Sequence, residues 1–171
     1  MVITPEYLAR SGTEHGEQTA LFCWANMAHQ QGFAIANDMG SYGKAMRFDI
    51  DNPAVPELRW LFAVPNGGGR GMVQGTALKA EGVKAGVSDV CLPVPKWAPD
   101  KYGEPRPVYF GLFIEMKRAD GKVTDVKKNQ HDFIDFVKAQ GYFADVAFGW
   151  KQAVQIVEWY LTQEPSNDAS R

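Results

Sequence analysis

Two charged residues end the most apolar segment of the sequence. Residues 108–117 are typical of a central strand covered on both faces, and Glu115 and Lys117 lie two apart at its end. Strand alternation puts both side chains on the face of Phe113. Such charges are costly unless they are paired or bound to a metal. The alternative interpretation is a surface ion pair where the strand reaches solvent.

Asp89 lies in the preceding predicted strand, 87–94. Consecutive strands are usually neighbours, so Asp89 and Glu115 can converge on one cation. Two carboxylates and a backbone carbonyl form the hard oxygen site that Mg²⁺ or Mn²⁺ prefers. Lys117 beside them would activate a water and offset charge on a pentavalent phosphorus. This constellation suits phosphodiester hydrolysis.

Gln130 lies on the apolar stripe of a helix predicted over 124–140. It falls four residues after Val126 and four before Ile134, so it points inward with them. An inward Gln either satisfies a buried backbone group or faces the carboxylates, where it would orient a catalytic water, Lys117 or a phosphate.

Glu17 is the corresponding polar residue on the first helix, predicted over 14–31 and ended by Gly32. It lies four residues before Leu21 on the apolar stripe. Glu17 either complements the positive end of the helix dipole or supports the site.

Other motifs are absent or weak. The glycine-rich stretch 67–71 lacks the GxxxxGK[ST] pattern of a nucleotide-binding loop, so it more plausibly lets backbone approach a phosphate, with Arg70 as a charge contact. The three histidines have no ligand spacing, and no serine lies in a GxSxG motif.

The elements that must position these residues alternate between helix and strand. The predicted order is helix 14–31, strand 60–64, a brief helix over 74–82, strands 87–94 and 108–117, helix 124–140, strand 142–148 and helix 150–161. This order predicts an α/β sandwich with a small mixed sheet flanked by helices. We interpret 34–57 as an irregular insertion containing a short strand near 45–48, and 95–107 as a polar, proline-rich excursion with turn character. One domain over 1–161 is followed by a polar tail, 162–171.

Composition places the chain among globular proteins with a real core. It has 171 residues, of which 45% are hydrophobic and 22% charged, which excludes collagen-like and disulfide-scaffold classes. The net charge of −2 hides an asymmetry, because residues 58–153 carry fourteen basic and ten acidic side chains between acidic ends. A random fluctuation among solvated charges is one interpretation, and a localised phosphate-binding face is the other.

The sequence predicts a cytoplasmic protein. Cys23 and Cys91 lie far apart in apolar runs, which favours reduced core thiols over a disulfide or zinc site. No stretch approaches the apolar length that a membrane span needs, and the first ten residues lack the features of a signal peptide.

Several segments together resemble one known family. Residues 82–90, 113–118 and 141–149, with Gln130, are similar to the VRR-NUC domain, the virus-type replication-repair nuclease branch of the PD-(D/E)XK superfamily. The 65–68 loop and Glu17-Gln18 look like its stand-alone phage members. The resemblance covers residues 14–161, with 34–57 and 95–107 as insertions.

This resemblance implies a restriction-endonuclease-like core of αβββαβ type. It implies that Asp89, Glu115 and Lys117 are catalytic and that Glu17 and Gln130 support them. It also implies that Asp89, Glu115 and the Met116 carbonyl hold Mg²⁺ or Mn²⁺. The family usually has proline before the aspartate, where this chain has Ser88. Proline there shapes the backbone rather than doing chemistry.

The resemblance further implies a homodimeric endonuclease from a phage or prophage, acting in the cytoplasm of a bacterial host in DNA repair. Branched DNA, such as a Holliday junction, is the implied substrate, since two sites on a dyad suit paired incisions. The candidate phosphate contacts are Arg70, Lys84, Arg118, Lys127 and Lys128. Two alternatives stay open: a catalytically silent DNA-binding module that keeps the fold, and an α/β interaction domain whose Glu115 and Lys117 form a surface pair.

Overall fold

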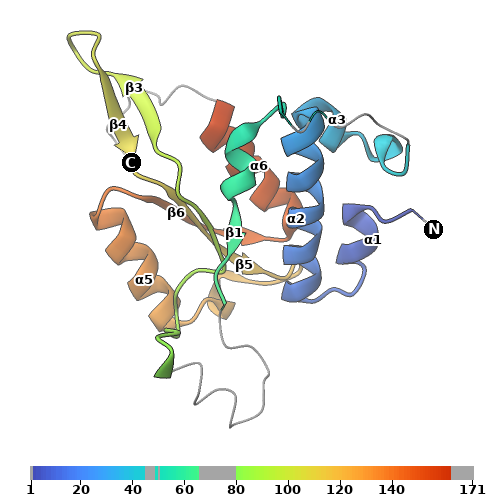
Figure 1. Ribbon diagram of the computed structural model, residues 1–171. Helices are drawn as coiled ribbons and strands as arrows, with labels where there is room; N and C mark the ends of the chain where they lie inside the picture. Colours follow the sequence, from blue (N-terminus) through green and yellow to red (C-terminus); the bar gives the residue numbers. More distant parts are fainter. Residues whose placement is uncertain (1, 45–48, 50, 66–79, 163–171) are drawn as a thin grey trace.

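A four-stranded mixed sheet lies at the centre of the computed structural model, which describes residues 2–44, 49, 51–65 and 80–162 (Figure 1). The strand order is β1-β2-β5-β6. The strands β1 (Phe62–Ala63), β2 (Val90–Leu92) and β5 (Leu112–Lys117) are antiparallel neighbours, and β6 (Phe143–Phe148) runs parallel to β5. The predicted α/β class with a small mixed sheet is confirmed.

Helices lie on both faces of this sheet. The helices α2 (Glu14–Gln31) and α6 (Trp150–Thr162) pack on one face, and α5 (Lys128–Ala139) packs on the other (Figure 1). Two shorter helices, α1 (Pro5–Ala9) and α3 (Phe33–Asn37), flank α2.

Successive side chains of β5 point alternately to the two helix-covered faces of the sheet, as strand alternation predicted. Ile114 and its even-numbered neighbours are buried against α2 and α6, whereas Phe113 packs with Ile134 and Val137 of α5. Because Glu115 and Lys117 are odd-numbered, they follow Phe113. The register of the strand therefore decides on which face the charged pair is buried.

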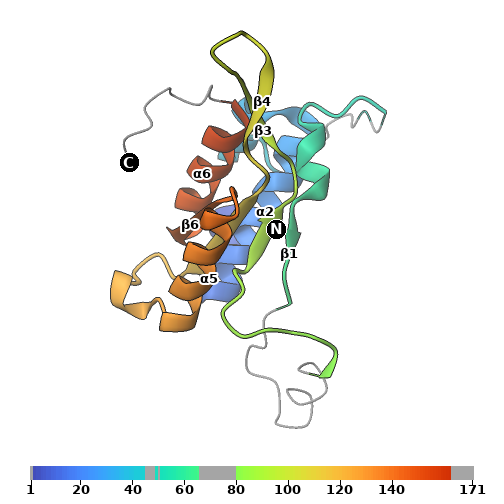
Figure 2. The same ribbon diagram turned by 90° about the vertical axis from the view of Figure 1, so that its left-hand side faces the viewer.

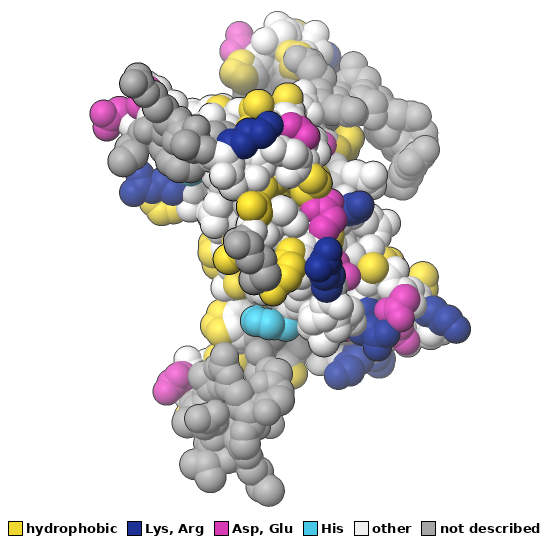
Figure 3. Space-filling model, turned by 90° about the vertical axis from the view of Figure 1, so that its right-hand side faces the viewer, with side chains coloured by type: hydrophobic (Ala, Val, Ile, Leu, Met, Phe, Trp, Pro, Cys, Tyr) yellow, Lys and Arg dark blue, Asp and Glu magenta, His cyan; other side chains and the backbone are white. Residues whose placement is uncertain are grey.

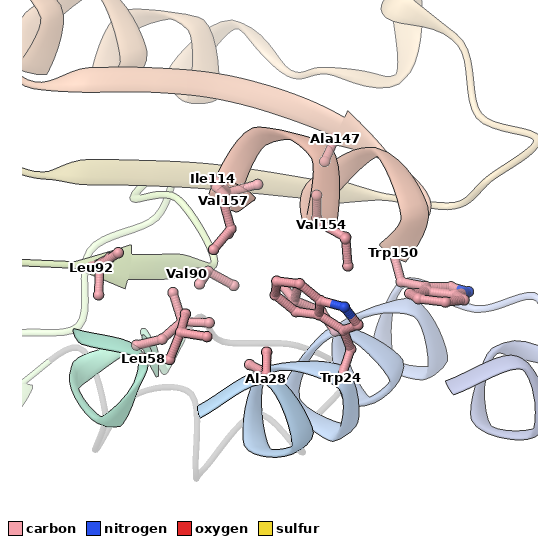
Figure 4. Packing of buried hydrophobic residues seen from close by; sticks show 14 of the residues in the cluster. Trp24, Ala28, Leu58, Val90, Leu92, Ile114, Ala147, Trp150, Val154 and Val157 are labelled. Atoms are coloured by element: carbon pink, nitrogen blue, oxygen red, sulfur yellow. The ribbon is translucent and has the colours of Figure 1, made fainter. Parts of the chain in front are cut away.

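The larger core forms around Trp24 of α2 (Figure 4). Its ring is fully buried, stacks on Phe33 at a centroid distance of 5.8 Å, and donates from Nε1 to Asn37 Oδ1 at 2.8 Å. The helix has the predicted bounds. Its cap is Thr13, which accepts from the Gly16 N–H at 3.0 Å, and Gly32 at φ 85° ends it.

The prediction of one continuous strand over 108–117 is wrong. The first part belongs to β4 (Pro105–Tyr109), and β5 begins only at Leu112. The chain breaks at Phe110, whose N–H donates to the Gly141 carbonyl, and at Gly111, where a Cβ would lie 3.1 Å from the Leu92 carbonyl oxygen. Apolarity alone did not reveal this close approach of backbone.

The prediction of turn structure over 95–107 is also wrong. The strands β3 (Lys96–Pro99) and β4 pair in an antiparallel hairpin that projects from the body of the protein (Figures 1 and 2). Prolines at positions 99, 105 and 107 are compatible with this hairpin, because each strand of a two-stranded sheet has one edge that pairs with no other strand of the described chain, where a proline nitrogen can lie.

Three further predictions need correction. The insertion at 34–57 contains α3 and two 3-10 helices, η1 (Met39–Ser41) and η2 (Pro56–Trp60), so the strand predicted over 60–64 shrinks to β1. The strand 87–94 likewise shrinks to β2. The helix predicted from 124 begins at Lys128, because residues 123–125 form the separate 3-10 turn η3 (Val123–Asp125).

Several predictions lie at the margins of the described chain. The strand near 45–48 and residues 74–79 of the brief helix lie outside the described residues. Of the described remainder of that helix, Ala80 is helical and Glu81 and Gly82 form a turn. Thr162 still belongs to α6, and the rest of the predicted tail is likewise outside. Across the described ranges, no helix has the length and apolarity needed to cross a membrane. Cys23 and Cys91 both carry free thiols. Cys91 is buried as predicted, whereas Cys23 is only partly buried, and burial raises the pKa of Cys91 to about 11.

Candidate active site

The charged pair at the end of β5 is buried rather than exposed. Glu115 is fully buried and Lys117 is 3% exposed. Lys117 Nζ donates to Glu115 Oε1 at 2.6 Å and to the Met116 carbonyl at 3.2 Å. The surface-pair interpretation is therefore wrong. Two charges removed from water together require compensation from their surroundings.

Asp89 lies directly across from this pair. The β2–β5 register pairs Val90 with Ile114, so its continuation places Asp89 opposite Glu115 on the same face. Asp89 Oδ2 also accepts the backbone N–H of Met116 at 2.8 Å. The predicted convergence of the two carboxylates is thus present.

The electrostatic surroundings of Glu115 favour its neutral form. Burial is the largest cause, and the nearby charge of Asp89 adds to it. Lys117 acts in the opposite direction but does not cancel them, and the pKa of Glu115 rises from 4.5 to about 7. One ammonium is therefore insufficient for two adjacent carboxylates, and a further cation would relieve this imbalance.

Gln130 holds the other side of Glu115 Oε1. It lies in the first turn of α5, and its Oε1 accepts the Lys127 backbone N–H at 2.8 Å. Since that partner is a donor, the amide orientation is fixed, and Nε2 donates to Glu115 Oε1. The prediction that Gln130 faces the carboxylates is confirmed.

The second oxygen of Glu115 is left open. Oε2 is a buried atom without a hydrogen-bond partner among the described residues. Together with Asp89 and the Met116 carbonyl it supplies the hard oxygen donors that suit Mg²⁺ or Mn²⁺. No group of three or more His, Cys, Asp or Glu suited to a metal occurs in the described ranges, so a site here depends on the backbone carbonyl and on water. The donor set fits a hydrated divalent cation.

Glu17 occupies a structural position beside this site. It is 3% exposed, and its Oε2 accepts the Trp150 backbone N–H at 2.9 Å, at the start of α6. The adjoining Gly149 N–H donates to the Lys117 carbonyl at 2.9 Å. Glu17 thus satisfies a free donor of α6 and joins α2 and α6 to the end of β5.

This position predicts a stability effect for Glu17. In Glu17→Ala, the buried Trp150 N–H loses its charged acceptor, so we expect the free energy of unfolding to fall by about 1–3 kcal/mol. In Glu17→Gln, which keeps an acceptor oxygen, the free energy of unfolding should fall by less than in Glu17→Ala. Urea unfolding of both variants measures this, and equal losses would contradict the capping role.

Glu14 is a neighbour of the site that sequence reasoning missed. Its Oε1 lies 3.7 Å from Lys117 Nζ, and the side chain is about half exposed. It begins α2 one turn before Glu17. The signal that could have revealed it is this spacing of three, which puts two acidic residues on one helix face.

Four of the five predicted phosphate contacts are exposed at this end of the protein. Lys84 lies on the loop whose Gly86 approaches α5, where a Cβ would come within 2.5 Å of the Asn129 carbonyl oxygen. Lys127 and Lys128 begin α5, and Arg118 directly follows β5. Arg70 lies outside the described residues.

Nearby acids partly neutralise these basic residues. Arg118 is paired with Asp120 at 2.6 Å, and Lys128 with Asp132 at 2.7 Å. Figure 3 also shows basic and acidic side chains lying beside one another on the face at the right of Figure 1. The basic excess of residues 58–153 is therefore not a uniform positive surface.

Ser88 carries a second unpartnered polar atom. It is fully buried, and its Oγ has no hydrogen-bond partner among the described residues. Ser88→Ala removes this unsatisfied hydroxyl, so we expect the free energy of unfolding to rise by about 1 kcal/mol. Ser41 is the matched control, because its Oγ donates to Asp38 Oδ2 at 2.7 Å. Ser41→Ala should lower the free energy of unfolding. Denaturant unfolding compares the two, and a loss in Ser88→Ala would contradict this reading.

The comparisons with known proteins agree with this arrangement at the level of the fold. A solved structure described as a VRR_NUC domain protein superimposes with a TM-score of 0.56 at 19% sequence identity, covering 89% of this chain and 90% of that one. No protein-family model matches the sequence, and no curated protein matches it. The resemblance seen in the sequence is therefore confirmed as a VRR-NUC fold.

Proposed function

We propose that this chain is a divalent-metal-dependent endonuclease that hydrolyses DNA phosphodiester bonds and prefers branched DNA. The observation that carries the proposal is the buried carboxylate of Glu115. One oxygen is held by Lys117 and Gln130, and the other, on the side of Asp89, has no hydrogen-bond partner recorded among the residues that the structure describes. The fold, shared with a VRR_NUC domain protein, supports the same chemistry.

The residues present would hold one cation. Asp89, the free oxygen of Glu115 and the Met116 carbonyl would bind it, with water and a phosphate oxygen completing the coordination. When bound, such a cation polarises the phosphoryl group and offsets its growing negative charge.

The chain's own residues position the reacting atoms. Of the three N–H donors of Lys117, two are used by Glu115 Oε1 and the Met116 carbonyl. The third, on which the half-exposed Glu14 has only a loose claim at 3.7 Å, would orient the attacking water or contact a phosphate oxygen. As the water oxygen forms its bond to phosphorus, it gives up a proton to bulk solvent, and the ester oxygen leaves as a hydroxyl group after taking a proton from water. The ammonium stabilises the negative charge that builds up on the phosphoryl oxygens. Gln130 prevents Glu115 from rotating away.

The raised pKa of Glu115 predicts how stability depends on pH in metal-free protein. Its folded value, about 7, exceeds the ordinary 4.5, so the folded state binds this proton more tightly. The contribution to stability is complete below about pH 4.5 and is lost as the pH rises through 7. Melting temperatures across this range in EDTA measure it. In Glu115→Gln, which cannot titrate, the melting temperature should fall less as the pH rises. A fall as steep as in the wild type would contradict the assignment of this pH dependence to Glu115.

A plasmid-nicking assay tests the proposed activity. The full chain should convert supercoiled DNA to nicked or linear product with Mg²⁺ or Mn²⁺ and not in EDTA. Asp89→Asn should abolish the product while retaining the fold by circular dichroism. A silent DNA-binding module would instead bind DNA in a salt-sensitive way and give no metal-dependent product.

The preference for branched DNA and the homodimer belong to the same proposal. A four-way junction and a paired duplex of equal length, compared as substrates, measure the preference. Two active sites related by a dyad would cut a junction in pairs, and analytical ultracentrifugation reports whether two copies associate. Equal rates on both substrates would contradict the preference.

A further inference from the structure

The sheet face that carries Asp89 and Glu115 continues beyond the cover of α5. The β1–β2 register pairs Phe62 with Cys91, and Cys91 pairs with Phe113 in β5. Phe62 therefore lies on the same face as Phe113 and Glu115. The helix α5 packs over β5 and β6 on this face. The strand β1 lies at the opposite edge of the described sheet, away from α5 (Figure 2).

Two aromatic rings and one guanidinium stand on this uncovered edge. Leu61 is buried in the main core, whereas Trp60 and Phe62 on either side of it are 60% and 47% exposed. Both rings therefore face away from the core, Trp60 at the end of η2 and Phe62 at the start of β1. The guanidinium of Arg59 lies 5.5 Å from the centre of the Trp60 ring. We call Arg59, Trp60 and Phe62 the edge platform.

The edge platform is directly connected to the candidate active site. The Val64 N–H donates to the Asp89 carbonyl at 2.8 Å. Phe62 lies two residues before Val64, which corresponds to about 7 Å along an extended strand. Scattered exposed apolar residues need no explanation, but Phe62 lies on the strand that pairs with the segment carrying Asp89, on the sheet face of the proposed cation site.

We propose that the edge platform stacks an unpaired DNA base next to the cleaved phosphate and so selects branched or frayed substrates, an inference that rests on the proposed function. Aromatic rings stack on any base, and the guanidinium supplies a contact for the neighbouring phosphate. In a fully paired duplex the bases already stack on one another and are not available. The platform therefore recognises an unpaired strand and not a sequence.

Fluorescence anisotropy of labelled DNA tests this in EDTA, where no cleavage occurs. The two ligands are a forked duplex with unpaired arms and a blunt duplex of equal length, at one fixed salt concentration. We expect Phe62→Ala and Trp60→Ala each to weaken fork binding by about 5- to 100-fold and duplex binding by less than about twofold. Phe62→Leu, which keeps apolar bulk without a ring, should behave as alanine, whereas Phe62→Tyr should restore binding.

Two exposed aromatic residues far along the chain serve as matched controls. Trp97 of β3 is 55% exposed and Phe136 of α5 is 61% exposed. Their alanine variants should bind the fork as wild type does. This comparison separates stacking at the edge platform from a general loss of surface aromatic area.

The outcomes distinguish the two proposals. Wild-type preference for the fork that survives Phe62→Ala and Trp60→Ala would overturn the edge platform and leave the nuclease proposal standing. Equal losses on fork and duplex would also overturn it. A changed sedimentation mass in these variants would show a protein interface instead. Failure of the wild type to bind either DNA would count against both proposals.

Discussion

Replacing Lys117 with methionine is expected to lower kcat for DNA cleavage by about 10²- to 10⁴-fold, the range for loss of a positioned charge or acid–base group. The ammonium of Lys117 is buried and aimed by two acceptors, Glu115 Oε1 and the Met116 carbonyl. Methionine keeps similar bulk but supplies no charge and no donor. Single-turnover cleavage at saturating Mg²⁺ measures the loss.

Folding must be followed in the same variant, because Lys117→Met breaks a buried ion pair. Loss of one partner of such a pair typically costs about 3–5 kcal/mol. The pKa of Glu115 is already about 7 and would rise further, so protonation should moderate this cost at lower pH. Lys117→Arg keeps the charge and provides the second variant. A folded Lys117→Met enzyme with wild-type kcat would refute the role of this residue.

Trp24→Ala is expected to reduce the free energy of unfolding by about 3–5 kcal/mol, the usual cost of deleting a buried aromatic side chain. The Trp24 ring is fully buried in the larger core, where it stacks on Phe33 and bonds to Asn37. No other element can collapse into so large a volume without distorting α2. Denaturant unfolding monitored by circular dichroism measures the change.

Trp97→Ala is the control for this core substitution. Trp97 is the same residue type, on β3, and more than half exposed. Its loss should change stability by no more than about 0.5 kcal/mol. Equal losses of stability in Trp24→Ala and Trp97→Ala would mean that Trp24 does not anchor α2 as described. The positions of Glu14 and Glu17, which lie on α2, would then also be contradicted.

The face of β5 and the bounds of α2 could be predicted because each depends on a regular period. Alternation alone placed Glu115 and Lys117 with Phe113, and the helical stripe placed Gln130 toward them. Thr13, which caps the first turn, and Gly32 set the ends of α2. Where periodicity, caps and burial agree, local pattern determines local structure.

The remaining features depend on contacts between distant segments, which no local pattern encodes. The apolar run is interrupted at Gly111, where a side chain would crowd the Leu92 carbonyl, and the β3–β4 hairpin forms despite its prolines. For Glu17 the sequence predicted either a role at the start of its own helix or a role in the site, whereas the structure shows its carboxylate accepting the Trp150 N–H of a different helix, α6. Glu14 approaches Lys117 across about a hundred residues of chain, so its spacing from Glu17 places it on the same helix face but does not indicate that it lies near Lys117.

One measurement tests the central claim most directly. A crystal soaked in Mn²⁺ should show an anomalous difference peak bound by Asp89 and by the oxygen of Glu115 that has no partner in the described chain. The peak should disappear in Asp89→Asn. Mn²⁺-supported cleavage of DNA by a protein whose crystals hold no ion between Asp89 and Glu115 would contradict the account.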